Sequence, residues 1–145
     1  ESYDHIRINI ANGDMVGHTG NLEATIEAVE FVDECVGKLV EACKIHNAIL
    51  LITADHGNAD EMAQWDKKKK APKVDGNGNL VPSTAHSKHP VPFIIMDPQN
   101  GWTINGTHGT HGTHIGGLAQ IGATLLKLCD VPIPNDYLPE LVQPI

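Results

Sequence analysis

The chain has 145 residues, 41% of them hydrophobic and 19% charged, which is enough apolar sequence for the core of one domain. Its formal net charge of -8 argues against nucleic acid or an anionic membrane surface as a partner, because both require cationic faces. No apolar stretch approaches the roughly 20 residues that span a bilayer, which argues against a membrane protein. The cysteines Cys35, Cys43 and Cys129 lack a CxxC spacing, so we expect reduced thiols and a soluble, cytoplasmic protein.

In chain order, the first predicted elements are a strand, a helix and a second strand. Residues 6–11 are strand-like from the outset, so we expect a fragment whose N-terminal part is missing. Apolar residues at three- and four-residue steps predict a helix from Asn21, its candidate N-cap, to about Ile45. Residues 48–53 then form a short apolar run. A strand, helix and strand at this spacing predict a βαβ unit in a parallel sheet.

The second half of the chain predicts an exposed excursion, a strand and a helix. Residues 65–82 contain the run Lys67–Lys70 and a Gly/Asn-rich turn, which favour an exposed hairpin. The lysines are interpreted as a solvated face, with a phosphate-binding patch as the alternative. A buried strand is predicted at 91–96, a helix at 118–128 and a helical turn within 136–143.

Residues 106–114 repeat Gly-Thr-His three times. This tract is too short for a solenoid and is typical of a surface loop. Its histidines His108, His111 and His114 have adventitious nickel or zinc binding as their alternative role.

Five residues stand apart as candidate metal ligands because each lies in a Gly- or Pro-punctuated turn beside a predicted strand. They are Asp14, His18, Asp55, His56 and His86. Sites in open α/β sheets form at the carboxyl ends of strands, and crowded carboxylates repel one another unless a cation lies between them. Oxygen and imidazole donors without thiolate favour manganese, zinc, cobalt or ferrous iron. By contrast, His5, His46 and His89 are interpreted as structural.

At these residues the chain resembles the 2,3-bisphosphoglycerate-independent phosphoglycerate mutases, metalloenzymes of the alkaline phosphatase superfamily. The resemblance rests on three stretches in order, from Tyr3 to about Val131. They are Asn-Gly-Asp-Met-Val-Gly-His-Thr-Gly at 12–20, Thr-Ala-Asp-His-Gly-Asn-Ala at 53–59, and Thr-Ala-His at 84–86 with Pro-Val-Pro at 90–92. The combination is more specific than any one motif.

The resemblance implies an α/β, alkaline-phosphatase-like fold with a mostly parallel sheet flanked by helices. Residues 1–145 would be the C-terminal portion of its metal-binding, phosphatase-like domain. It also implies interconversion of 3-phosphoglycerate and 2-phosphoglycerate in glycolysis, through a phosphoserine and two divalent metal ions. Manganese is expected, with magnesium, cobalt or zinc as alternatives.

By the same resemblance, Asp14, His18 and His86 bind one metal, and Asp55 and His56 bind the other. The serine nucleophile, a further aspartate and the phosphotransferase domain match nothing in this chain. The isolated segment is therefore expected to be inactive. Its expected partners are the small phosphoglycerate substrate and the rest of the same polypeptide, in a protein that is monomeric at full length.

Two other interpretations remain open. The first is another enzyme of the alkaline phosphatase superfamily, such as phosphopentomutase, which shares the Ala-Asp-His-Gly-Asn core at 54–58. The second is a non-catalytic metal-binding module, favoured if the natural gene product begins near Glu1. An assay of phosphoglycerate against ribose phosphate separates the enzymes, and the mass of the native protein tests the module.

Overall fold

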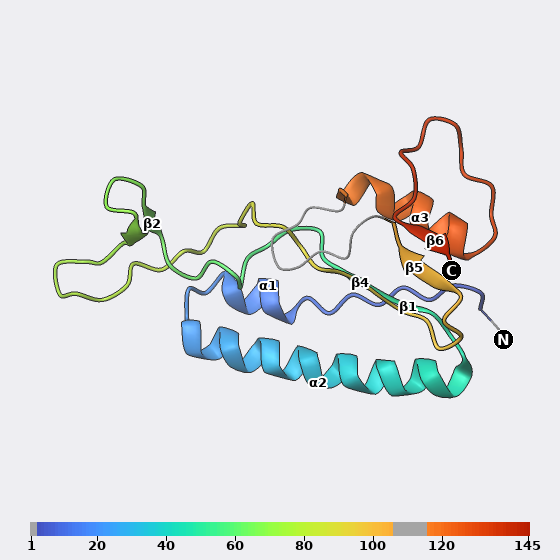
Figure 1. Ribbon diagram of the computed structural model, residues 1–145. Helices are drawn as coiled ribbons and strands as arrows, with labels where there is room; N and C mark the ends of the chain where they lie inside the picture. Colours follow the sequence, from blue (N-terminus) through green and yellow to red (C-terminus); the bar gives the residue numbers. More distant parts are fainter. Residues whose placement is uncertain (1–2, 106–115) are drawn as a thin grey trace. The chain divides into compact units, whose positions relative to one another are not determined.

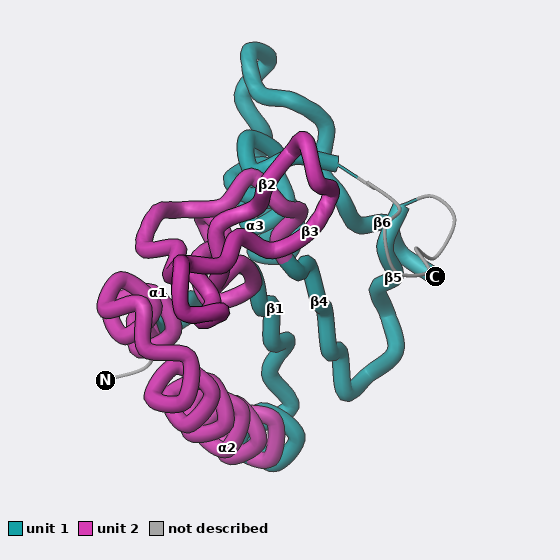
Figure 2. The backbone as a smooth tube through the Cα atoms, turned by 90° about the vertical axis from the view of Figure 1, so that its left-hand side faces the viewer, with its two compact units in different colours: residues 1–8, 42–53, 92–145 teal, residues 9–41, 54–91 magenta. Residues whose placement is uncertain are grey.

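The computed structural model describes residues 3–105 and 116–145. The Gly-Thr-His tract at 106–114 therefore lies outside the described residues. Contacts divide the chain into two compact units, shown in Figure 2. Unit 1 comprises residues 1–8, 42–53 and 92–145, and unit 2 comprises residues 9–41 and 54–91. All five predicted metal ligands belong to unit 2.

Unit 2 contains two helices that lie side by side, α1 (Asn12–Gly17) and most of α2 (Leu22–His46) (Figure 1). The predicted N-cap of α2 is confirmed, because the Asn21 Oδ1 accepts a hydrogen bond from the Ala24 N–H at 3.1 Å. Gly13 of α1 approaches Val29 of α2 closely enough that a Cβ atom there would lie 3.8 Å from the Val29 Cγ2. This distance is an ordinary van der Waals contact, so α1 and α2 are adjacent at this point.

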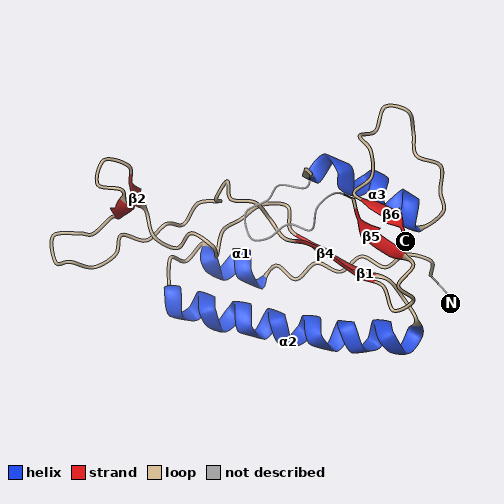
Figure 3. Ribbon diagram, in the orientation of Figure 1, coloured by secondary structure: helices blue, strands red, loops and turns tan. Residues whose placement is uncertain are grey.

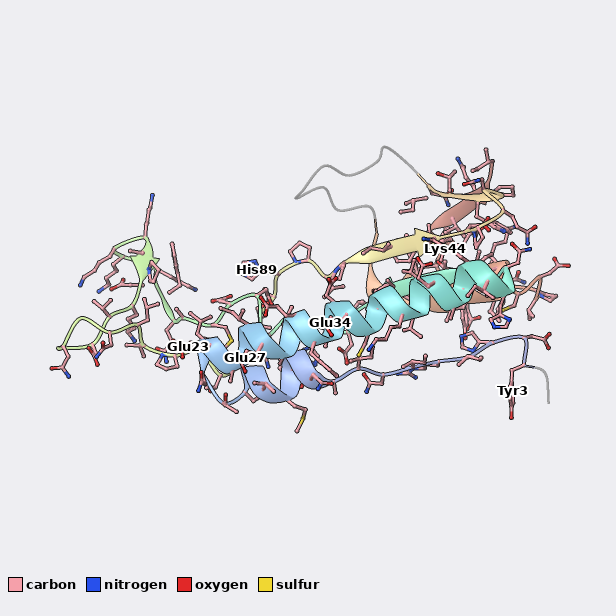
Figure 4. The ribbon with its side chains drawn as sticks, turned by 90° about the horizontal axis from the view of Figure 1, so that it is seen from below. Tyr3, Glu23, Glu27, Glu34, Lys44 and His89 are labelled. Atoms are coloured by element: carbon pink, nitrogen blue, oxygen red, sulfur yellow. The ribbon has the colours of Figure 1, made fainter. Side chains whose placement is uncertain are left out.

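The helix predicted from Asn21 to about Ile45 is confirmed as α2. Its side chain at Thr25 is buried, and the Thr25 hydroxyl donates to the Asn21 carbonyl at 2.7 Å. The acidic residues Glu23, Glu27 and Glu34 lie along the same helix (Figure 4). Lys44 and His46 occupy its last turn, where a positive charge interacts favourably with the helix dipole.

The predicted exposed hairpin at 65–82 is confirmed. Strands β2 (Trp65–Asp66) and β3 (Ala71–Pro72) pair antiparallel, and isolated bridges join Ala63 to Pro82 and Val74 to Leu80. Figure 3 shows that most of this segment is loop rather than regular structure. The run Lys67–Lys70 forms the exposed turn between β2 and β3.

Unit 1 contains two antiparallel strand pairs and a short helix. Strand β1 (Leu50–Thr53) pairs with β4 (Phe93–Met96), and β5 (Trp102–Ile104) pairs with β6 (Val142–Pro144). The 3-10 turn η1 (Leu118–Gln120) leads into helix α3 (Ile121–Leu128).

The buried centre of unit 1 lies where α3 meets the chain before and within β6. It consists of Ala123, Thr124, Leu141 and Val142. The Leu141 N–H donates to the Thr124 hydroxyl at 3.0 Å, which satisfies a backbone donor that would otherwise be buried without a partner. This contact ties the last strand to the helix.

Three sequence predictions are corrected by these elements. Residues 6–11 form no strand, and every strand pair in the described part of the chain is antiparallel. The predicted parallel βαβ unit is therefore not formed among these residues, because a strand requires a neighbour to hydrogen-bond its backbone. Residues 136–143 form no helical turn; Val142 and Gln143 belong instead to strand β6. Among the described helices, none is both long and apolar enough to cross a membrane.

A candidate metal centre in unit 2

Helix α1 presents the first two predicted ligands on one face. Asp14 and His18 are four residues apart, so their side chains lie one above the other, and His18 Nε2 is 3.2 Å from Asp14 Oδ1. The sequence placed both residues in a turn at the end of a strand. The structure corrects this: Asp14 lies within α1 and His18 is its C-cap residue.

The loop at 84–87 brings the third predicted ligand to the same carboxylate. His86 Nε2 lies 3.4 Å from Asp14 Oδ1 and 3.2 Å from His18 Nε2. The Thr84 carbonyl lies 2.7 Å from His18 Nδ1. A carbonyl oxygen can only accept, so this contact requires a proton on Nδ1, and in the neutral imidazole Nε2 is then the nitrogen that can bind a cation.

Ser87 anchors this loop to the segment that carries the other two predicted ligands. The Ser87 N–H donates to the Gly57 carbonyl at 2.8 Å, and its hydroxyl donates to the Asp60 carboxylate at 2.7 Å. A Cβ atom at Gly57 would collide with the side chains of Ser87 and Asp60. Glycine at position 57 therefore allows the two segments to come together.

The three donor atoms of Asp14, His18 and His86 are spaced as the ligands of one ion would be. All lie within 4.8 Å of one another, and their three separations are between 3.2 and 3.4 Å. Ligands bound tetrahedrally at 2.0–2.1 Å from an ion are separated by about 3.3 Å. One carboxylate oxygen and two imidazole nitrogens therefore fit a divalent metal.

The other predicted pair, Asp55 and His56, lies beside this group. The His56 ring stacks on the His86 ring with centroids 3.6 Å apart, and His56 Nδ1 is 3.9 Å from Asp14 Oδ1. Asp55 Oδ1 lies 3.6 Å from His56 Nε2, and the Asp55 side chain is 88% exposed. The structure therefore brings His56 to the three-residue group, while Asp55 contacts that group only through His56.

Sequence reasoning missed Asn58, which contacts the candidate ligands directly. The Asn58 side-chain amide donates to Asp14 Oδ1 at 2.7 Å and reaches the Asp14 carbonyl at 3.3 Å. Only 5% of Asn58 is exposed. Asn58 belongs to the Ala-Asp-His-Gly-Asn stretch at 54–58, which is the one sequence signal that could have identified it. Its burial and its bond to Asp14 are visible only in the structure.

The same hydrogen bond sets the charge state of Asp14. Donation from Asn58 lowers the pKa of the Asp14 carboxyl, and the neighbouring imidazoles of His18, His56 and His86 lower it further against an opposing effect of desolvation. Asp14 is therefore held as a carboxylate, which is the form that binds a cation.

The histidines that were interpreted as structural lie outside this group. His89, labelled in Figure 4, places its Nε2 3.0 Å from the Glu61 carboxylate. His46 lies in the last turn of α2, and His5 is an exposed residue before α1.

Comparison with known proteins relates this geometry to a family. The description "Metalloenzyme superfamily" matches residues 1–133. A probable 2,3-bisphosphoglycerate-independent phosphoglycerate mutase of Leptospira interrogans (strain 56601) is 48% identical over 97% of this chain and 24% of its own length. The 2,3-bisphosphoglycerate-independent phosphoglycerate mutase of Trypanosoma brucei brucei is 46% identical over 97% of this chain and 25% of its own length.

A solved structure gives the same relationship. The chain superposes on Leishmania mexicana phosphoglycerate mutase, crystallised at low cobalt concentration, with a TM-score of 0.82 and 45% identity over 96% of this chain and 25% of that one. The predicted resemblance and α/β, alkaline-phosphatase-like fold are thus confirmed, and the chain spans about a quarter of the relatives' length. With three ligand atoms converging in unit 2 and a family match over most of its length, the chain belongs to the metalloenzyme superfamily.

Proposed function

We propose that this chain is the metal-binding part of a cofactor-independent phosphoglycerate mutase, which interconverts 3-phosphoglycerate and 2-phosphoglycerate. The observation that carries the proposal is the convergence of Asp14, His18 and His86 in a chain similar to enzymes of that name. Two divalent ions, held in part by these residues, would supply charge neutralisation for the phosphoryl group. The substrate is a small phosphoglycerate.

The proposed ligand assignment follows the two groups of side chains. Asp14, His18 and His86 hold one ion, and Asp55 and His56 contribute to the second. The aspartate and the serine nucleophile that complete the second site would come from outside these 145 residues, as would the phosphotransferase domain. The relatives are about four times as long as this chain. That length supports the proposal that residues 1–145 are one portion of a phosphatase-like domain.

The proposed metal is manganese. Carboxylate and imidazole donors also suit cobalt and zinc, and the Leishmania mexicana structure was determined in cobalt. Magnesium is a weaker candidate because imidazole is not among its preferred ligands. We further propose that the enzyme acts in the cytoplasm, because Cys35, Cys43 and Cys129 are free thiols. Interconversion of 3-phosphoglycerate and 2-phosphoglycerate would place it in glycolysis.

The complete polypeptide that carries this chain provides the test. Its rates with 3-phosphoglycerate and with ribose 1-phosphate would be measured after chelation and again after addition of Mn²⁺. We expect metal-dependent formation of 2-phosphoglycerate without added 2,3-bisphosphoglycerate. Turnover of ribose 1-phosphate alone would support phosphopentomutase instead. Full activity in the presence of chelator would contradict the metal assignment.

A further inference from the structure

Asn58 joins the two groups of candidate ligands. It lies two residues after His56 in the chain, yet its side-chain amide is bound to Asp14 on helix α1, 44 residues away in sequence. Both acceptors, Asp14 Oδ1 at 2.7 Å and the Asp14 carbonyl at 3.3 Å, face the same nitrogen of Asn58. This fixes the orientation of the amide, because only its NH₂ group can donate to both.

The Asp14 oxygen that Asn58 contacts is also the one that the histidines surround. Oδ1 lies 3.2 Å from His18 Nε2, 3.4 Å from His86 Nε2 and 3.9 Å from His56 Nδ1. A hydrogen bond to this atom therefore holds the carboxylate at the point where the imidazoles converge. Ligands that are fixed in this way before a metal arrives lose less conformational freedom on binding.

The oxygen of the Asn58 amide, unlike its nitrogen, is not hydrogen-bonded in the described part of the chain. The Asn58 Oδ1 is buried, and within residues 3–105 and 116–145 it has no hydrogen-bond partner. It faces Gly17, where a Cβ atom would collide with it. A buried acceptor without a partner costs stability, so the amide is an unfavourable choice for packing alone.

We propose that Asn58 is a positioning residue that couples the two metal sites by fixing the His56 segment to Asp14. The inference rests on the proposed function, because it requires that the protein bind metal. Loss of the Asn58 amide frees both the Asp14 carboxylate and the segment that carries Asp55 and His56. It therefore weakens both sites, whereas loss of a ligand that belongs to one site weakens chiefly that site.

Asn58→Leu is the informative substitution, because leucine has nearly the shape of asparagine but no donor and no acceptor. The complete polypeptide would be titrated with Mn²⁺ by calorimetry, and thermal unfolding would be followed in chelator. We expect affinity for both ions to fall by about 10–100-fold, the usual effect of removing a hydrogen-bond partner of a ligand. In chelator, the melting temperature should fall only slightly, because the loss of donation to Asp14 is offset in part by removal of the unpaired Asn58 acceptor.

Asn21→Ala is the matched control. Asn21 is also in unit 2, but its side-chain oxygen accepts a local hydrogen bond, from the Ala24 N–H at the start of α2. This variant should melt at a lower temperature and yet bind both ions like the wild type. His86→Ala provides the second comparison, with one site weakened far more than the other.

Each outcome has a distinct meaning. If the wild type binds no Mn²⁺, the proposed function fails. If the wild type binds two ions and Asn58→Leu binds them equally well, or loses only one, the coupling role of Asn58 is wrong while the metal assignment stands. If Asn58→Leu melts far below the wild type in chelator, Asn58 is a packing residue rather than a positioning residue.

Discussion

His86 and His89 are three residues apart on one loop, yet their side chains contact different groups. His86 Nε2 lies 3.4 Å from Asp14 and 3.2 Å from His18, whereas His89 Nε2 lies 3.0 Å from the partly exposed carboxylate of Glu61. A contact this open to solvent contributes little to stability, because water and salt screen it. The two histidines therefore differ in role because they contact different side chains.

The substitutions His86→Ala and His89→Ala should therefore have unequal effects. We expect His86→Ala to weaken Mn²⁺ binding by more than about 100-fold, beyond the loss that follows removal of an outer partner. His89→Ala should leave binding within a few-fold of the wild type. Metal content after dialysis against a graded Mn²⁺ buffer measures both. Equal losses would show that the third ligand has been misassigned.

At the scale of elements, the β2–β3 hairpin depends on two aspartates that cap its turns. Asp66 Oδ1 accepts from the N–H groups of Lys68 and Lys69 at 2.9 and 3.1 Å. Asp75 Oδ1 accepts from those of Asn77 and Asn79 at 2.8 and 2.9 Å. These backbone donors lower the pKa of both carboxyl groups, because they stabilise the charged form.

This lowering predicts the direction of a pH effect on the hairpin. A depressed folded-state pKa contributes stability that is complete above the unfolded aspartate pKa of about 3.9 and is lost as pH falls through the lower folded value. Acidification from neutral pH should therefore leave the turn amides unchanged until below pH ~4 and then release them. Their NMR shifts and exchange rates measure this. Asp66→Asn, which retains an acceptor, should abolish the acid transition for Lys68 and Lys69 alone.

Local patterns predicted the elements better than their pairing. Helix α2, its Asn21 cap, strands β1 and β4, and the exposed hairpin all follow from periodicity and turn residues. The antiparallel pairing of β1 and β4 does not follow from such local patterns, because it depends on the path of residues 54–92 between the two strands. Residues 6–11 alternate like a strand but have no strand neighbour in the described part of the chain.

The sequence predicted those residues of the site whose side chains are themselves common metal ligands. Asp14, His18 and His86 were chosen from adjacent glycines and turns, and they converge. Asn58 was not chosen, because its importance comes from burial and from one hydrogen bond to a residue 44 positions away. Such contacts depend on the tertiary fold, whereas ligand type depends on side-chain chemistry alone.

At the scale of the whole molecule, the 145-residue chain should bind metal without catalysing phosphoryl transfer. This expectation rests on the proposed ligands and on the family resemblance, by which the serine that forms the phosphoenzyme has no match in these residues. Purified chain in excess Mn²⁺, assayed by coupled turnover of 3-phosphoglycerate, should show no rate above the buffer blank. The complete polypeptide assayed in parallel serves as the positive control. Measurable turnover by the short chain would mean that its own residues supply a nucleophile.

The exposed turn Lys67–Lys70 separates His86 in sequence from the other members of the candidate metal centre. A specific protease site inserted in this turn, where insertions are well tolerated, would leave Asp14, His18 and His56 on one polypeptide and His86 on the other. A bound ion would then act as a reversible cross-link between two pieces. The cut protein should stay associated to a higher urea concentration with Mn²⁺ than with chelator, as size-exclusion chromatography would measure. His86→Ala should remove that difference. Metal binding by His86 is then measured from the association of the two pieces, without an activity assay.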